Sequence, residues 1–297
     1  MGCGAKPHVS RRGGIPITAI IRVTIQEAAR RKVFIVMGII AALFLLLWGV
    51  LLHFAMRMDI PDNFSDIAAY MLTTMGLQFS SMLLALLTIM LTAGTIASDL
   101  DTGLVHSILS RPIRRSEYVL GKLFGLMLIT AAFATAFFAL LTVIGAIFGL
   151  STITALSIWR ILGGWLLFIT TPISVLCLTL WGSARFRTVP NGILMIFIYI
   201  LGNIGGMVEM VGQLLNNSSI NSAGIFLSLV SPFHMLYVTC ENFLLSSANL
   251  VENAARFAGG LTGSGTPPSS WMYVYIAVYV VAFLVFALRN FAKKDIV

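Results

Sequence analysis

Charged residues are scarce in this chain of 297 residues: Asp, Glu, Lys and Arg together make up 10% of it. Soluble domains normally have about a quarter of their residues charged. Hydrophobic residues instead make up 58% of the chain, and the mean hydropathy is +0.96. Several apolar runs are long enough to cross a bilayer. The composition therefore excludes an ordinary soluble domain and predicts an all-α, polytopic membrane helix bundle.

Cysteine is also scarce, and this limits the chemistry of the chain. Its three cysteines, Cys3, Cys177 and Cys240, fall in a terminal tail, an apolar segment and a loop, a pattern that predicts no disulfide. The 14 methionines are scattered through apolar segments, where methionine usually serves as packing material. No His or Cys cluster accompanies them, so we expect no metal site and no cofactor bound by this chain.

The sequence lacks the motifs of nucleotide binding and of hydrolytic catalysis. No G-x-x-x-x-G-K-[ST] loop is present to hold nucleotide phosphates, and neither H-E-x-x-H nor G-x-S-x-G occurs. Acidic residues in the middle of a span and internal repeats, which favour an ion-coupled secondary transporter, are also absent. A membrane-embedded enzyme and a secondary transporter therefore stay only as alternative functions.

Six apolar segments predict six transmembrane helices, at residues 33–56, 67–97, 123–150, 161–181, 193–211 and 271–288. The second has 31 residues, about 46 Å as a helix. This exceeds the ~30 Å thickness of the hydrocarbon core, so we expect the helix to tilt or to project at one end.

Residues 15–32 precede the first span. Their apolar positions follow three-four spacing and most of their arginines lie on other faces, which predicts an amphipathic helix in the headgroup region. The alternative is a simple extension of the first span.

Residues 212–270, between the fifth and last spans, form the expected outer region. Residues 225–245 are apolar enough for a span, but polar or helix-breaking residues interrupt them. These interruptions are Ser231, Pro232, His234, Glu241 and Asn242. Because non-helical backbone is tolerated at membrane depth only against other protein, we expect a re-entrant pair of helices here rather than a full crossing.

The basic residues predict the orientation. With six spans and a cytoplasmic N-terminus, 16 of the 19 Lys and Arg residues face the cytoplasm. Only Arg57, Arg160 and Arg256 then lie outside. We therefore expect a protein of the cytoplasmic (inner) membrane with both termini in the cytoplasm. The net charge of +8 suits contact with membrane lipid, and we expect no nucleic acid partner.

Residues 98–122 form the only long polar stretch between two apolar segments, and in this topology they face the cytoplasm. Thr102 can cap a short helix over residues 102–109, and Pro112 must end it. Leu104, Ile108 and Leu109 share one side of that helix. Such a helix suits docking into a groove of a cytoplasmic partner. The alternative is that its apolar side packs on the underside of the membrane.

The stretch SDLDTGLVHSILSRPIRRSEYVLGKLFG resembles the first cytoplasmic loop of type-two ABC exporter permeases. The residues that match that family's pattern are Asp99, Asp101, Thr102, Gly103, Ile108, Leu109, Ser110, Pro112, Ile113, Arg115, Tyr118, Gly121 and Lys122. Leu104 stands where threonine is usual. Residues 176–209 are also similar to the branch of this family that contains the copper-enzyme-maturation (NosY-like) permeases.

The resemblance implies that residues 1–297 form a single, non-catalytic permease domain. Such a subunit pairs with a second permease, here expected as a homodimer, and docks on a separate ATPase subunit that binds ATP and Mg. It further implies an ATPase-coupling role for Asp99, Asp101, Gly103, Leu104, Ile108, Leu109, Pro112, Arg115 and Lys122. The resemblance does not specify a substrate.

Several polar or small residues in the spans are weaker candidates for a role. Gly202 and Gly206 in the fifth span permit close helix approach, and the family resemblance places that span near a dimer axis. Gln78 and Thr88 in the second span either line a substrate path or form hydrogen bonds between helices. Glu209 and His53, each near the end of a span, are either functional or merely hydrated. The weaker candidates are thus His53, Gln78, Thr88, Gly202, Gly206 and Glu209.

Overall fold

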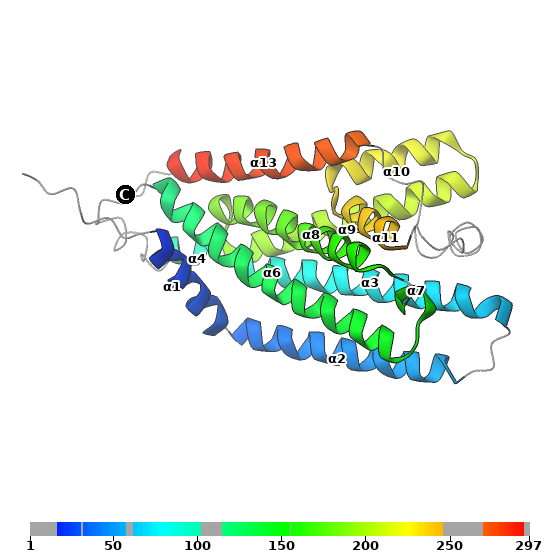
Figure 1. The fold of residues 1–297 in the computed structure, drawn as a ribbon. Helices are drawn as coiled ribbons and strands as arrows, with labels where there is room; N and C mark the ends of the chain where they lie inside the picture. The colour runs from blue at the N-terminus through cyan, green and yellow to red at the C-terminus, as the bar shows by residue number, and fades with distance from the viewer. Residues whose placement is uncertain are drawn as a thin grey trace, which may run out of the picture.

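The computed structural model describes residues 17–30, 32–57, 62–101, 115–154, 156–245 and 270–293, and all regular elements in these ranges are α-helices (Figure 1). In chain order they are α1 (Ile17–Arg30), α2 (Lys32–Ala55), α3 (Asp62–Thr92), α4 (Ala97–Asp101), α6 (Arg115–Ile147), α7 (Ser151–Thr154), α8 (Ile158–Arg185), α9 (Thr188–Leu214), α10 (Ser218–Val230), α11 (Phe233–Leu245) and α13 (Ser270–Lys293).

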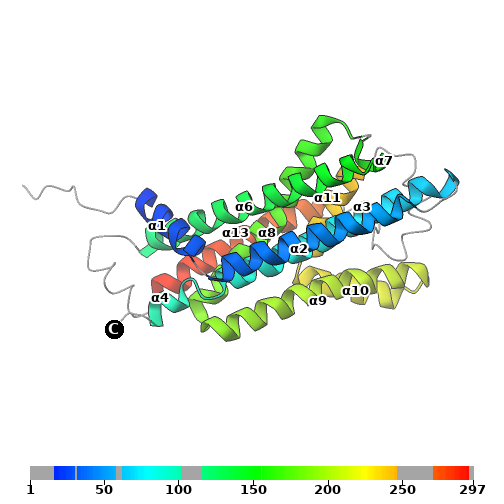
Figure 2. The same cartoon turned by 90° about the horizontal axis from the view of Figure 1, so that it is seen from below.

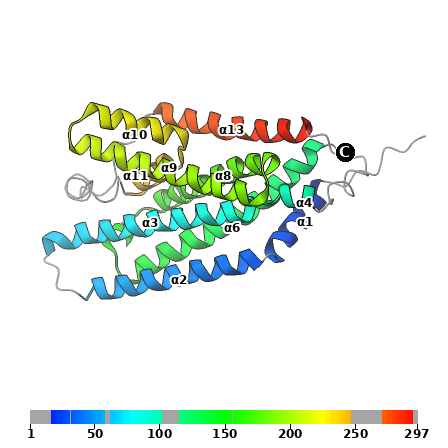
Figure 3. The same cartoon turned by 180° about the vertical axis from the view of Figure 1, so that it is seen from behind.

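The long helices form an elongated bundle. α1, α4 and the last turn of α13 lie at one end, which we call the proximal end (Figures 1 and 3). The end of α2, the start of α3 and the short helix α7 lie at the opposite, distal end. The core is apolar, as in the cluster that includes Trp48, Phe138 and Phe168.

Five helices of the described chain are long and apolar enough to cross a membrane: α2, residues Ile67–Asp99, Glu117–Ile147 of α6, α8, and Thr188–Gln213 of α9. The expected last span, α13, lies beside α8 (Figure 2), where the rings of Trp181 and Phe283 are 5.3 Å apart. Its apolar part, Tyr273–Arg289, is shorter than the other five, so its full crossing stays a prediction. The prediction of a polytopic helical membrane protein is confirmed.

The helix at the N-terminal side is separate from the first span and packs against α6. α1 lies at an angle to α2 (Figure 1), and two glycines of α6 make room for it. A Cβ placed at Gly121 would lie 2.7 Å from Ile20, and one at Gly125 would lie 2.8 Å from Thr24. The apolar side of the predicted amphipathic helix is therefore occupied by α6, so contact with lipid does not account for all of it.

The second span is not one continuous helix. α3 ends at Thr92, residues 93–96 form turns, and α4 begins at Ala97. α3 alone still has 31 residues, so the excess length that the sequence predicted is retained in α3, and the break adds a change of direction near the proximal end.

Helices α10 and α11 form a bent pair, with an angle of 101° between them at Ser231 and Pro232. α10 runs from the distal end along α9, so closely that a Cβ at Gly224 would lie 2.3 Å from the Glu209 backbone nitrogen. The break lies level with the middle of α9, at Gly202. α11 then returns toward the distal end, where Leu244 packs on Gly164 of α8. The bend confirms that residues 225–245 do not continue as one straight helix with α10, and the re-entrant arrangement stays a prediction because a broken span has the same bend.

Candidate functional site

A buried ion pair joins α4 to α6 at the proximal end. Lys122 of α6 donates to the Asp99 carboxylate of α4 and, at 2.8 Å, to the carbonyl oxygen of Thr95. The Tyr118 hydroxyl donates to the same Asp99 oxygen. Asp99 is 4% exposed and Lys122 is 3% exposed. We call Thr95, Asp99, Tyr118 and Lys122 the Asp99–Lys122 cluster.

The cluster holds both ends of the segment that the sequence predicts as the coupling helix. Asp99 lies in α4, which ends at Asp101, and Lys122 lies in the second turn of α6, which begins at Arg115. Residues 102–114, and with them Gly103, Leu104, Ile108, Leu109 and Pro112, lie outside the described residues. Asp99 and Lys122, predicted as coupling residues, are thus turned toward each other inside the protein.

The turn between α3 and α4 is bound to two other spans. Ser183 of α8 accepts hydrogen bonds from the backbone nitrogens of Ile96 and Ala97, at 3.0 and 3.2 Å. Asn191 of α9 donates to the carbonyl oxygen of Ala93 at 2.8 Å and to that of Thr179 at 3.1 Å. These side chains satisfy backbone groups that the break would otherwise leave unpaired.

The sequence does not single out the two side chains, Ser183 and Asn191, that form hydrogen bonds with the turn between α3 and α4. Ser183 and Asn191 flank the loop between the fourth and fifth spans, where a polar residue is unremarkable by itself. Both are completely buried. The consequence is a set of hydrogen bonds that joins α4 and the turn before it to α8 and α9.

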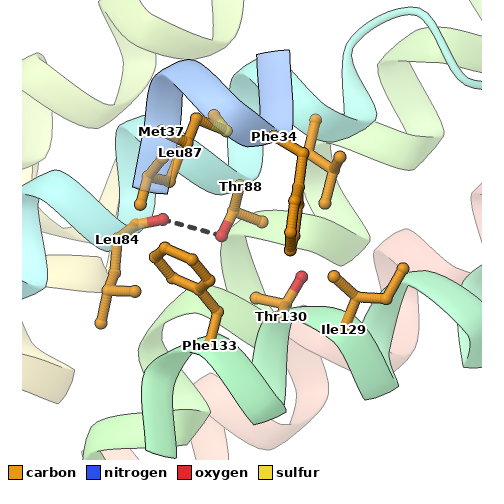
Figure 4. Close-up of a pocket in the computed structure, with 9 residues that line it drawn as sticks. Phe34, Met37, Leu84, Leu87, Thr88, Ile129, Thr130 and Phe133 are labelled. Carbon is orange, nitrogen blue, oxygen red and sulfur yellow. Dashed lines mark hydrogen bonds between the residues drawn. The ribbon is translucent and has the colours of Figure 1, made fainter. Parts of the chain in front are cut away.

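An apolar groove lies between α2, α3 and α6 (Figure 4). The empty space in it and at its open side together is about 300 Å³, and its lining includes Phe34, Leu87 and Phe133. Thr88 lies in its wall, but its hydroxyl donates to the Leu84 carbonyl oxygen at 2.8 Å. The groove therefore offers a mainly apolar surface, together with the buried Thr130 hydroxyl, which has no hydrogen-bond partner among the described residues.

The sequence of the chain matches a known protein family over nearly its whole length. Residues 18–296 match the family model described as ABC-2 family transporter protein. The chain belongs to the ABC-2 transporter family. Permeases of this family are transport subunits without catalysis of their own and generally work with an ATPase subunit. No curated protein matches the chain significantly.

The family assignment made from the loop motif is thereby confirmed. The narrower resemblance to the copper-enzyme-maturation branch is not supported by this match and stays a prediction. The described part of this ABC-2 chain contains no group of three or more His, Cys, Asp or Glu residues that could hold a metal ion.

The predicted glycine seam of α9 is used within the chain. A Cβ at Gly202 would lie 2.5 Å from the Ser231 carbonyl oxygen, and a Cβ at Gly206 would lie 2.1 Å from the His234 ring. These two glycines therefore admit the re-entrant pair, and that face of α9 is not available to a second subunit.

The remaining candidates lie toward the distal end. His53 contacts the rings of Phe54 and Phe148, each 6.0 Å away between centroids. Glu209 lies where α10 crosses α9, and its Oε2 is buried without a hydrogen-bond partner among the described residues. Gln78 of α3 donates to Asn203 of α9 at 3.5 Å, so it links two spans as the alternative interpretation expected.

No acid was expected inside the bundle, and Glu241 corrects this expectation. The residue lies on α11 and is 1% exposed. It was recognised only as an interruption of an apolar segment. Because α11 turns back into the protein, a glutamate assigned to the outer region is enclosed by spans.

Proposed function

We propose that this ABC-2 chain is the permease subunit of an ATP-driven exporter. A separate ATPase subunit binds ATP and Mg, and it docks on the coupling helix at residues 102–109. The observation that carries the proposal is the Asp99–Lys122 cluster, because it fixes both ends of this segment to the bundle by a buried ion pair. A segment that only covered the membrane surface would not need such an anchorage.

The coupling residues fall into two groups in this proposal. Leu104, Ile108 and Leu109 provide the apolar surface that enters a groove of the ATPase. Asp99 and Lys122 act indirectly, because they are buried and keep the helix in position. The remaining predicted coupling residues lie between these two groups in the sequence, where they shape or flank the docking helix. They are Asp101, Gly103, Pro112 and Arg115.

The path from α4 through Ser183 and Asn191 supports a mechanical role for the cluster. When nucleotide closes two ATPase subunits, the docked helix moves with them and the ion pair carries the displacement to α4. The hydrogen bonds of Ser183 and Asn191 then pass it to α8 and α9. Hydrogen-bond and ion-pair networks of this kind can carry energetic coupling between distant sites.

The charge distribution supports a cytoplasmic proximal end in the inner membrane. Basic residues of the described chain gather there, and the distal end has few of them. At the proximal end are Arg22, Arg30, Lys32, Arg115, Lys122, Arg185, Arg187, Arg289 and Lys293, and at the distal end are Arg57 and Arg160. Both described ends of the chain, α1 and α13, would then face the ATPase.

We propose that two copies of the chain pair through the outward face of α9. Ile193, Phe197, Ile200, Ile204, Met207 and Val211 are exposed and apolar. Their spacing of three and four residues forms one continuous face along the helix. Gly202 and Gly206 occupy the opposite side and hold the re-entrant pair, so a second copy would meet the aliphatic face.

Replacement of Leu104 or Ile108 by Asp tests the coupling. We expect each variant to lose ATPase association at least tenfold in a pull-down, because a carboxylate cannot enter an apolar groove without a large desolvation cost. Membrane insertion should be unchanged, since the segment lies between spans. His106→Asp, on the other side of the same helix, is the matched control and should retain binding. Retention of the ATPase by both Leu104→Asp and Ile108→Asp contradicts the docking proposal.

A further inference from the structure

Two polar faces meet inside the distal half of the bundle. Three side chains of α11, at spacings of three and four residues, lie opposite three of α3 at spacings of four. Tyr70 donates to Glu241 Oε1 at 3.3 Å, and Tyr237 donates to the Thr74 carbonyl oxygen at 3.1 Å. We call the six residues the polar stripe: Tyr70, Thr74 and Gln78 of α3, and His234, Tyr237 and Glu241 of α11.

The polar stripe is rich in acceptors that have no partner. Glu241 is 1% exposed, and its Oε2 accepts no hydrogen bond from the described residues. Nor do these residues include a Lys, Arg or His that forms an ion pair with it. Gln78 Oε1 and His234 Nδ1 are buried without a partner as well. A membrane-embedded acid in this situation is costly unless a positive charge or a proton joins it.

The surroundings of Glu241 select the kind of positive charge. Tyr70 and Tyr237 both interact with its carboxyl, and the His234 ring lies 6.2 Å from that of Tyr237. Aromatic rings next to a carboxylate favour an organic ammonium group, which is held by the charge and by the ring faces together. A cation such as Ca²⁺ needs six to eight oxygen ligands, far more than this part of the structure presents. An anion would meet Glu241 without a counter-charge.

The helix break provides a means of access to this site. α11 is joined to α10 at Ser231 and Pro232, at the depth of the middle of α9, and the Ser231 hydroxyl has no partner among the described residues. Broken helices inside a membrane bundle are typical of substrate sites in transporters. Movement of α11 about this break would separate it from α3 and open the polar stripe toward the distal end.

We infer that the polar stripe binds a substrate that carries a protonated amine, with Glu241 as its counter-ion. The inference rests on the proposed function, since it assigns a chemical class to the exported substrate. Gln78 and His234, about two turns further into the bundle, provide a second polar contact for the same molecule. The class is thus an organic cation with an aromatic or aliphatic body.

Binding of 2-phenylethylamine to the purified full chain, without an ATPase, tests the site. We expect the amine to raise the thermal midpoint of unfolding, because a ligand that binds only the folded state stabilises it. 2-Phenylethanol and phenylacetate, which have the same body without the positive charge, should have no such effect. Glu241→Gln should weaken amine binding at least tenfold, and Glu209→Gln, the matched acid on α9, should leave it unchanged.

A second measurement uses the unaltered protein and does not depend on the folding of a variant. Dicyclohexylcarbodiimide activates carboxyl groups in apolar surroundings, and the product is either an N-acylurea or, with a primary amine, an amide and free urea. Mass spectrometry therefore follows the loss of the unmodified Glu241 peptide, so that both products count as modification. We expect 2-phenylethylamine to slow modification of Glu241 at least fivefold and 2-phenylethanol to leave the rate unchanged.

Equal amine binding by wild type and Glu241→Gln overturns the inference. So does modification of Glu241 at a rate that the amine does not change, which would indicate a carboxyl that carries only a proton. Because no ATPase is present in either measurement, failure of the amine site leaves the docking of residues 102–109 intact. Failure of docking in the pull-down likewise leaves amine binding unaffected.

Discussion

The proximal and distal halves of the bundle each enclose a carboxylate, and the two carboxylates differ in what surrounds them. Asp99 at the proximal end is paired with Lys122 and also accepts a hydrogen bond from Tyr118. Glu241 in the distal half accepts a hydrogen bond from Tyr70, but it has no cation beside it among the described residues. A paired charge at nearly complete burial fixes two helices to each other. An unpaired one leaves the site able to take a charge from elsewhere.

The comparison assigns different tasks to the two halves. In our proposal, the proximal half is a rigid joint that receives force, so its charges must not separate. The distal half must exchange a substrate, so its charge must be satisfied only part of the time. Substitutions at Lys122, Gly202 and Glu241 test this difference. The expected loss in the free energy of unfolding decreases in that order.

Removal of the lysine from the proximal pair should have the largest effect. Lys122→Met leaves the Asp99 carboxylate buried without its cation, and breaking a buried pair in this way costs about 3–5 kcal/mol. We expect a loss of this size in the free energy of unfolding in detergent, together with loss of ATPase association. Chemical denaturation followed by tryptophan fluorescence measures the first, and the pull-down measures the second.

The double variant Asp99→Asn with Lys122→Met is the control for this prediction. It removes both charges, so no uncompensated carboxylate stays in the interior, and most of the lost stability should return. If the single and double variants were equally unstable, the pair would matter through its shape and not through its charge, and the contrast with Glu241 would fail.

A smaller loss is expected where the re-entrant pair is held against α9. Gly202→Ala places a Cβ about 2.5 Å from the Ser231 carbonyl oxygen, so backbone must shift. Overpacking of this kind costs about 1–3 kcal/mol. Gly38→Ala on α2, where nothing lies within 4 Å of the added Cβ, is the matched control and should be neutral or slightly stabilising. Equal effects of the two changes would show that α10 and α11 are not held by close approach.

Much of the architecture was predictable from local properties of the chain. Apolar length alone located the spans, because a bilayer demands about 20 apolar residues per helix. Ser231, Pro232 and Glu241 indicated that residues 225–245 do not cross as one helix, and they form the bent pair. The loop motif predicted the family, which the match over residues 18–296 confirms.

The contacts that give the residues their roles were not predictable in the same way. Asp99 and Lys122 both match the motif, but the motif does not say that they bind each other across 23 positions. Ser183 and Asn191 have no local signature, because their partners are backbone groups exposed by a break in another helix. The sequence indicates that Gly202 permits close approach of another helix. In the structure the segment that approaches it is Ser231 of the same chain and not a second subunit.

The smallest effect on stability is expected at Glu241, and it sharpens the comparison most. Glu241→Gln keeps an oxygen that accepts the hydrogen bond of Tyr70 and removes no ion pair. We therefore expect a change in the free energy of unfolding of about 1 kcal/mol or less, near the net value of one hydrogen bond. The same denaturation measurement as for Lys122→Met detects it, and Tyr70→Phe, which deletes the donor, provides the scale for a single lost bond.

A loss as large as that of Lys122→Met would mean that Glu241 carries a structural charge like Asp99. A small loss of stability, combined with a large loss of amine binding, separates a residue kept for its ligand from one kept for the fold.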